Sequence, residues 1–315
     1  MTHKRSWDFH DSGANPIHSL PMANEVDVIV TAREESIGTF SVRRSLPSVK
    51  RRMVGPFTFL DHMGPASVPM NVLPHPHIGI ATLTYLFDGE VLHRDSLGNT
   101  QAIRPREVNW MVSGRGIAHS ERTETAAIAS LHGIQAWVAL PEENEEADPG
   151  FTHLDTSDLP LVEDRGVEAR LLSGSAYGLT SPAPSFSPHF YVAARLAKGA
   201  CMALPREHHE RAAYIATGAI HFDGNSYNAG QLIVASSGGE PVLLAESDAD
   251  ILLLGGDPLG HRFMWWNFVS SRKERIEEAK ADWLARRIPL PPDDDREFVP
   301  LPPDLRPKPQ PEPMS

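Results

Sequence analysis

Two short pairs of side chains in this sequence could bind a metal ion. His75 and His77 lie one residue apart in PHPHIGIATLTYLFDG, which begins at residue 74, and His119 and Glu121 repeat that spacing in SGRGIAHSERTE. In an extended strand, residues i and i+2 project to the same side, so each pair could present two ligand atoms together. Imidazole nitrogens and carboxylate oxygens suit divalent transition metals. On spacing alone the alternative stays open that these are surface or core histidines that bind nothing.

Short β-rich runs separated by turn signals surround both pairs. They include VDVIVTA, IGTFSVRR, GPFTFLDHMGP, EVNWMVSGRG and GIQAWVAL. Their spacing of about 8 to 12 residues predicts an antiparallel sandwich or barrel. The turn signal FDGE follows the first pair and SGRG precedes the second, so we expect both pairs to return to one barrel mouth. Pro76 between the two histidines indicates the start or edge of a strand.

A second set of such runs, beginning with HFYVAARL, follows a loop-like stretch, so the chain is predicted to be all-β, with two tandem β-barrels and a C-terminal helix. The expected order is an N-terminal arm over 1–24, a metal-binding barrel over 25–141, a connecting segment over 142–185, a second barrel with the terminal helix over 186–288, and a Pro-rich acidic tail over 289–315.

The segment SSRKERIEEAKADWLARR predicts the helix. Ser271 and Glu274 have the spacing of a capping box. We expect the helix to pack on the second barrel through its apolar face. That face consists of Ile276, Ala279, Trp283 and Leu284.

The tail after the helix has a composition that excludes regular structure. It holds ten prolines in 27 residues, so neither a helix nor a central strand is expected there. Its apolar FVPL segment at 298–301 could attach it to a neighbouring surface or to a second subunit.

The second barrel has only a partial counterpart of the first histidine pair. In LPREHHERAAYIATGAI, His208 and Glu210 could share a face, and His209 offers a second possible pair. Because the stretch from 231 to 256 contains no histidine, a site there would lack its other half. We therefore expect this barrel to be free of metal.

His93 and Asp95, in LHRDSLG, lie between the two ligand pairs along the chain. A role in a turn or hairpin is the favoured interpretation. The alternative is that they line the pocket and support the metal ligands.

Composition excludes several classes of function. The net charge of −12 repels a phosphate backbone, so direct nucleic-acid binding is not expected. The single cysteine, Cys201, excludes a disulfide framework and suits a reducing compartment. The N-terminal MTHKRSWDFHDSG has no apolar stretch typical of a signal peptide, and no run of 18 apolar residues occurs. We expect a cytoplasmic protein without a membrane segment.

Two longer motifs resemble a known family. PHPHIGIATLTYLFDGEVLHRDSLG followed by VNWMVSGRGIAHSER is similar to the N-terminal signature of the pirin family, a bicupin branch of the cupin superfamily. WWNFVSSRKERIEEAKADW resembles the C-terminal signature of its bacterial members. The resemblance extends from about Val26 to Arg287 and implies two tandem cupin domains of jelly-roll type.

The resemblance also implies a ligand set and a metal. The family's four ligands correspond to His75, His77, His119 and Glu121, and similar proteins usually hold iron, so Fe(II) is expected, with nickel, copper, manganese and zinc as alternatives. Many cupins have a glutamate shortly after the first histidine pair, but positions 81–82 are Ala-Thr here. Glu121 then has to supply the carboxylate.

The resemblance leaves the activity open. One implied function is cleavage of flavonols such as quercetin with O₂, as in quercetin 2,3-dioxygenase, with Glu121 as both metal ligand and general base. Another is a non-enzymatic, iron-containing, redox-sensitive regulator that binds protein partners, and a third is a metal-bound scaffold without turnover. A homodimer is a further possible assembly.

Overall fold

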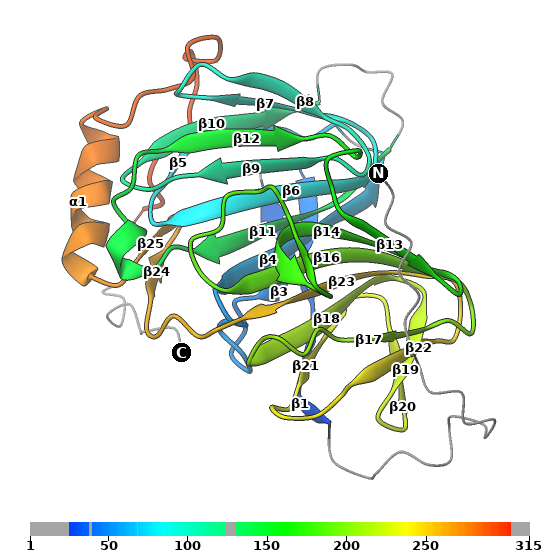
Figure 1. The fold of residues 1–315 in the computed structure, drawn as a ribbon. Helices are drawn as coiled ribbons and strands as arrows, with labels where there is room; N and C mark the ends of the chain where they lie inside the picture. The colour runs from blue at the N-terminus through cyan, green and yellow to red at the C-terminus, as the bar shows by residue number, and fades with distance from the viewer. Residues whose placement is uncertain (1–24, 38–39, 68, 124–129, 304–315) are drawn as a thin grey trace.

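The computed structural model describes residues 25–37, 40–67, 69–123 and 130–303, and strands are their main regular secondary structure (Figure 1). The strands of the first domain are β2 (Arg33–Ile37), β3 (Phe40–Leu46), β4 (Phe57–Ala66), β5 (Asn71–His77), β6 (Ile80–Asp88), β7 (Val91–Asp95), β8 (Thr100–Ile103), β9 (Val108–Val112), β10 (Ile117–Arg122), β11 (Leu131–Ala139) and β12 (Gly150–Leu154). They form a seven-stranded sheet in the order β12-β9-β6-β11-β4-β3-β2 and a four-stranded sheet in the order β5-β10-β7-β8.

The second domain repeats this plan. Its strands are β1 (Val26–Thr31), β13 (Leu161–Asp164), β14 (Val167–Ala176), β15 (Leu179–Thr180), β16 (His189–Leu196), β17 (Cys201–Ala203), β18 (Glu210–Thr217), β19 (Ala219–Phe222), β20 (Asn225–Asn228), β21 (Gln231–Ala235), β22 (Val242–Ala245) and β23 (Ala249–Gly256). The large sheet has the order β1-β21-β18-β23-β16-β14-β13, with β15 on β14, and the small sheet the order β17-β22-β19-β20. Matching strand orders confirm the predicted all-β tandem fold. The predicted arm over 1–24 lies outside the described residues.

The expectation that 142–185 is loop-like is wrong. This stretch contains a short 3₁₀ helix, η2 (Glu142–Asn144), and the strands β12, β13, β14 and β15. A bulge between Leu171 and Ser173 shifts the pairing of β14 with β16. A bulge breaks the two-residue alternation by which a strand is detected in a sequence.

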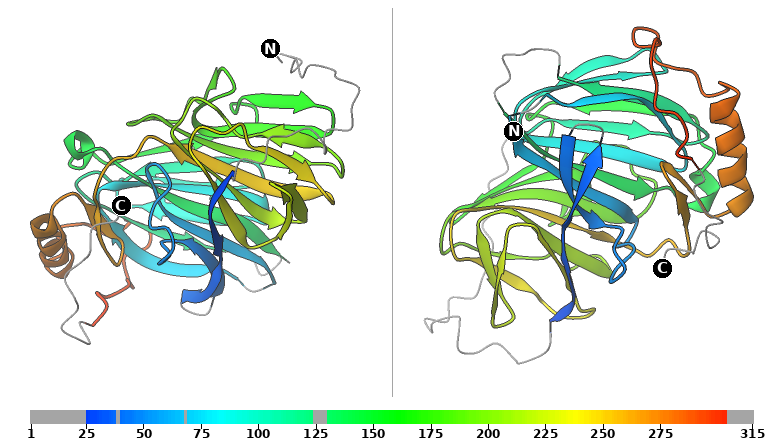
Figure 2. Two further views of the ribbon diagram at one scale, coloured as in Figure 1. Left: turned by 90° about the horizontal axis from the view of Figure 1, so that it is seen from below. Right: turned by 180° about the vertical axis from the view of Figure 1, so that it is seen from behind.

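The large sheets of the two domains contribute to one shared apolar core. Leu83 and Trp110 of the first domain belong to the same buried cluster as Tyr191 and Leu254 of the second. Figure 2 shows the two domains in contact along these sheets. Inside the second domain, between its own two sheets, lies a further buried apolar cluster that includes Leu196, Ile215 and Leu243. The interior of the first domain contains buried polar side chains, among them His77, His119 and Glu121.

The C-terminal helix packs on the first domain and not, as expected, on the second. The helix is α1 (Lys273–Leu284), preceded by the hairpin of β24 (Phe263–Trp265) and β25 (Phe268–Ser270). Trp283 and Ile276 share a buried cluster with Ile78, which follows β5, and with Ala118 of β10. Figure 1 shows α1 at this side of the first domain. Leu284, expected on the apolar face, is 71% exposed. No described helix is both long and apolar enough to cross a bilayer.

The predicted capping box is also wrong. Arg272 is the N-cap residue of α1, and no side chain caps the helix. Ser271 instead donates from its backbone N–H and its hydroxyl to the carboxylate of Glu145, at 2.8 and 3.0 Å. Glu145 is buried and ion-paired with Arg262 at 3.0 Å. A buried carboxylate needs hydrogen-bond donors, and Ser271 donates to Glu145 instead of capping the helix.

The C-terminal tail attaches to the strand that carries the first histidine pair. The N–H of Val299 donates to the carbonyl of Pro74 at 2.8 Å, and the carbonyl of Val299 accepts from Trp283 Nε1 at 3.0 Å. Phe298 packs edge-on against Trp283. The FVPL segment therefore binds a neighbouring surface of its own chain. Since β5 is the outer strand of its sheet, this segment covers part of an otherwise open edge.

An ion pair holds the same tail beside β10. Arg122 donates from Nε and Nη2 to the two carboxylate oxygens of Asp294, at 2.6 and 2.8 Å. Burial raises the pKa of Asp294, but the hydrogen bonds and charge of Arg122 outweigh burial, and the net shift is downward. Folding therefore favours the ionised carboxylate.

Replacing Asp294 by asparagine should loosen the tail. The variant loses a bidentate, partly buried ion pair, so we expect unfolding free energy to fall by about 1–2 kcal/mol. Cleavage within the tail by a nonspecific protease should become faster. Asp293→Asn, at an exposed neighbour, is the control and should behave as the wild type. Equal cleavage rates in all three proteins would show that the ion pair does not retain the tail.

Candidate metal centre

Two adjacent strands of the smaller first-domain sheet, β5 and β10, carry all four predicted ligands, and the next strand, β7, carries His93. In the order β5-β10-β7, antiparallel register places His75 opposite His119 and Glu121 opposite His93. Directly opposed residues point to the same side of a sheet, so these side chains share one face. They are at most 7% exposed, so this face is the interior of the domain.

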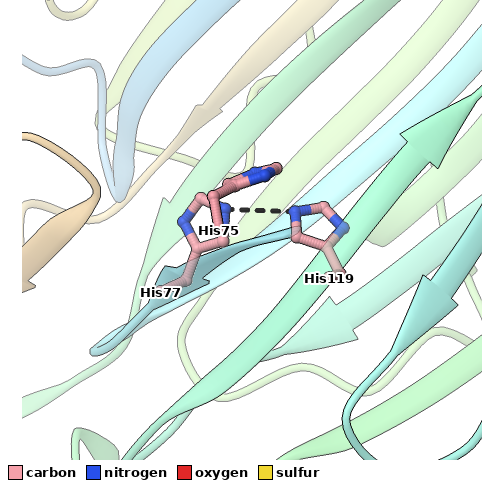
Figure 3. Close-up of side chains that lie close together, drawn as sticks. All are labelled: His75, His77 and His119. Carbon is pink, nitrogen blue, oxygen red and sulfur yellow. Dashed lines mark hydrogen bonds between the residues drawn. The ribbon is translucent and has the colours of Figure 1, made fainter. Parts of the chain in front are cut away.

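The three histidines form one cluster (Figure 3). Their possible ligand atoms all lie within 4.8 Å of one another. His77 Nε2 and His119 Nε2 are 3.1 Å apart. Nitrogens bound to one ion at about 2.0–2.1 Å are separated by a similar distance. The structure therefore brings His75, His77 and His119 together at a place where one ion would fit.

Glu121 lies on the same face but outside this cluster of three. The register shifts after His119, because Glu121 pairs with Val72, so β5 contains one more residue than β10 in this stretch. Glu121 Oε1 accepts a hydrogen bond from Gln135 Nε2 at 2.8 Å and lies 3.5 Å from Thr84 Oγ1. The carboxylate is therefore positioned by the opposite sheet. Its role as the fourth ligand stays a prediction.

Hydrogen bonds determine which nitrogen of two histidines is free. His75 Nδ1 lies 2.9 Å from the carbonyl of Leu73, which can only accept, so Nδ1 carries the proton and Nε2 the lone pair. Asp95 accepts from His93 Nε2 at 3.1 Å, which leaves His93 Nδ1 to accept from His119 Nδ1 at 3.3 Å. His119 Nε2 is then unprotonated. Such partners orient the ligands of metal sites.

His93 and Asp95 show the expected turn as well as a contact with a predicted ligand, and their support of a bound metal stays a prediction. Asp95 Oδ1 accepts from the backbone N–H groups of Leu97 and Asn99, at 2.9 and 3.1 Å, which is the turn role. Asp95 Oδ2 holds His93, and His93 contacts His119. The sequence could have favoured the second role, because His93 and Asp95 have the same alternating spacing as the ligand pairs.

Burial keeps the three imidazoles neutral. It lowers the pKa of His75 to about 4 and those of His77 and His119 well below the usual value, where neighbouring histidines add to the effect. Burial raises the pKa of Glu121, with the hydrogen bond from Gln135 opposing it. Metals bind neutral imidazole, so these histidines need release no proton at neutral pH.

Acid should destabilise the metal-free protein through these histidines. Each of these histidines has a lower pKa in the folded state than the value of about 6.5 in the unfolded chain, so the unfolded chain binds more protons in acid. Their contribution to the free energy of unfolding is therefore fully present above about pH 6.5 and is lost as the pH decreases toward 4. His75 alone should account for about 2 kcal/mol between pH 7.5 and 5. Urea unfolding of chelator-treated protein measures this difference.

A glutamine at position 75 tests the assignment. His75→Gln should show a smaller pH difference than the wild type, whereas His261→Gln, at an exposed histidine, should leave it unchanged. An undiminished difference in His75→Gln would place the acid sensitivity elsewhere.

Aromatic side chains surround the cluster. Trp137 meets His77 edge-on at 5.0 Å between ring centroids, and Phe59 stacks on Trp137 at 3.9 Å. Phe151 stacks on His93 at 4.5 Å. Trp137 and Gln135 were not predicted from the sequence as site residues. The signal was the alternation in GIQAWVAL, which places both on one side of β11.

The donors present fit a divalent transition metal. Three imidazoles converge, His75 and His119 each have an Nε2 lone pair available, and His77 Nδ1 is buried without a hydrogen bond of normal geometry. A nearby carboxylate would complete a mixed nitrogen and oxygen site, which suits iron, nickel, copper, manganese or zinc.

The second domain has no such cluster among its described residues. Its strands β17 and β22 occupy the places of β5 and β10 and contain no histidine. His208 Nε2 donates to the carbonyl of Ser175 at 2.9 Å, and the Glu210 carboxylate accepts from Arg51 Nη2 and the N–H of Gly55, both at 2.5 Å. These groups serve packing and domain contact.

Comparison with known proteins agrees with this architecture. A family model described as Pirin matches residues 39–138, and one described as the Pirin C-terminal cupin domain matches residues 191–289. A pirin-like protein of Caulobacter vibrioides is 51% identical over 286 residues, which cover 88% of this chain and 99% of that protein.

Two crystal structures described as quercetin 2,3-dioxygenase from Acinetobacter baumannii have similar folds. One is 33% identical, with a TM-score of 0.80, over 89% of this chain and 96% of the other. The second is 27% identical, with a TM-score of 0.76, over 84% of this chain and 98% of the other.

Proposed function

Since this chain belongs to the pirin family, we propose that it is a metal-dependent dioxygenase that cleaves a flavonol-like substrate with O₂. The observation that carries the proposal is the convergence of three buried, neutral imidazoles. The similarity to structures described as quercetin 2,3-dioxygenase supports the substrate class.

We assign His75, His77, His119 and Glu121 as the metal ligands. The metal we propose is Fe(II), because iron can exchange electrons with O₂ and zinc cannot. Asp95 and His93 keep His119 in the tautomer that ligates, through Nε2.

Glu121 is the general base of the proposed reaction. Its pKa is raised by burial, which makes it a better proton acceptor near neutral pH. Gln135 holds one carboxylate oxygen at 2.8 Å and so fixes the direction of the side chain. In this role the carboxylate takes the proton of a flavonol hydroxyl as the substrate binds.

The surroundings suit a flat aromatic ligand. Trp137 and Phe151 flank the histidines from two strands of the large sheet, and aromatic faces bind aromatic rings well. We also propose that the protein acts in the cytoplasm, a reducing compartment, because a chain with a single cysteine cannot form an internal disulfide.

Metal analysis combined with oxygen uptake tests the proposal. The purified protein should contain iron, consume O₂ with at least one member of a flavonol panel, and stop when treated with a chelator. Bound iron without uptake on any flavonol would contradict the enzyme assignment and favour the regulator that binds protein partners.

A further inference from the structure

We propose that the first domain holds a second divalent-cation site, made by His153, Glu107 and Asp155. The three side chains come from the edge strand β12, from the turn before β9 and from the residue after β12. Their possible ligand atoms all lie within 4.8 Å of one another. This cluster is separate from the three-histidine centre, and the proposal does not depend on the dioxygenase activity.

The tautomer of His153 is fixed from inside the domain. His153 pairs with Asn109 across β12 and β9, and its Nδ1 lies 2.7 Å from Asn109 Oδ1. An amide oxygen can only accept a hydrogen bond, so Nδ1 carries the proton. His153 Nε2 is then the atom that faces the two carboxylates.

The distances are those of ligands around an ion. His153 Nε2 lies 3.4 Å from Asp155 Oδ1 and 3.7 Å from Glu107 Oε2. A protonated Nε2 would approach one carboxylate to about 2.7–2.9 Å, as charge-assisted hydrogen bonds do. Tetrahedral ligands at about 2.0 Å from an ion are about 3.3 Å apart. Both separations are longer than a charge-assisted hydrogen bond and close to those of ligands that share a cation.

The donor set indicates the class of cation. One imidazole and two carboxylates suit Zn²⁺ or a similar transition ion, with water in the remaining position. Mg²⁺ and Ca²⁺ prefer oxygen ligands alone. The N–H of Arg104 donates to Glu107 Oε2 at 2.7 Å and orients this carboxylate. Asp155 is 68% exposed at its side chain, so an ion could enter from solvent. A bound ion would fasten the edge strand β12 to the turn before β9.

Zinc stoichiometry tests the proposal. Chelator-stripped full-length protein is dialysed against buffered Zn²⁺ and analysed for metal. The wild type should bind two ions per chain, His153→Gln one, His119→Ala one, and the double variant none. Asp155→Asn, an exposed and conservative change, should weaken the second ion at least tenfold without affecting the fold. His209→Gln, at an exposed histidine of the second domain, should keep both ions.

Two readouts separate this site from the histidine cluster. In His119→Ala, added Zn²⁺ should still raise the melting temperature, and this rise should disappear in the double variant. Co²⁺ substituted into His119→Ala should give a visible absorption that His153→Gln removes. One ion in the wild type that His119→Ala abolishes, or two ions retained in His153→Gln, would overturn the proposal.

Discussion

His119→Ala is expected to lose metal and oxygen consumption together. The change removes one of three convergent imidazoles and leaves a cavity beside His77, whose Nε2 lies 3.1 Å from His119 Nε2. Loss of a group that merely orients a ligand lowers metal affinity about 10–100-fold, and loss of a ligand should cost at least as much. Flavonol-dependent O₂ uptake should fall in proportion to the iron content.

The matched comparison for His119→Ala uses His93. His93→Gln removes the acceptor that orients His119 but leaves all three imidazoles, so iron affinity should fall by about 10–100-fold and activity should recover in excess iron. Full iron occupancy in His119→Ala, measured on protein that retains its fold, would show that the cluster is not the iron site.

Glu121→Gln is expected to retain much of the iron and lose the reaction. An amide oxygen can still coordinate weakly and three imidazoles remain, but the amide cannot accept the substrate proton. Loss of a general base typically costs about 10²–10⁴-fold in rate. Iron content and single-turnover oxygen consumption should be measured on the same preparations. A fully active, iron-loaded Glu121→Gln would limit the carboxylate to a ligand role and assign the proton transfer to another group.

Stability of the metal-free form gives an independent check on this variant. The raised pKa of Glu121 means that the folded protein disfavours the charged form of this carboxyl group. Its contribution to the free energy of unfolding is therefore present below about pH 4.5 and is lost as the pH rises through the folded-state pKa. Metal-free Glu121→Gln should therefore be more stable than the wild type at pH 7.5, with a smaller difference at low pH. A merely misfolded variant would be less stable at both.

Local periodicity predicted that the histidines of each pair share a face, but only the family resemblance favoured a metal site over histidines that bind nothing. His75 and His77 share a face because strand residues alternate, and the opposed pairing of His75 with His119 needs only two neighbouring antiparallel strands. The tandem all-β fold follows from the same alternation. Family resemblance supplied Glu121 as the fourth ligand, and the bulge that separates it from the cluster has no local signal in the sequence.

Apart from the strands missed within 142–185, the errors concern contacts between distant parts of the chain. The apolar face of α1 was predicted, but not the domain that it covers, because an apolar face does not specify the surface on which it packs. Ser271 does not cap the helix because it donates a hydrogen bond to Glu145, which lies 126 residues earlier in the chain. Similarly, β1 joins the second domain, where Val30 pairs with Leu232 about two hundred residues later. Periodicity describes an element and not its distant partner.

Segments near the two ends of the chain each pair with the other domain, and this constrains the order in which the protein can fold during synthesis. β1 precedes the other described strands along the chain, yet the strand that it pairs with is β21. Pro74 of β5 and the neighbouring Ile78 find their partners only once Val299 and Phe268 have emerged from the ribosome. A nascent chain that ends between the domains would expose edges of both future sheets. The two domains are therefore poor units for separate expression, and metal loading of the proposed centre should be a late event in biosynthesis, after Val299 has been synthesised.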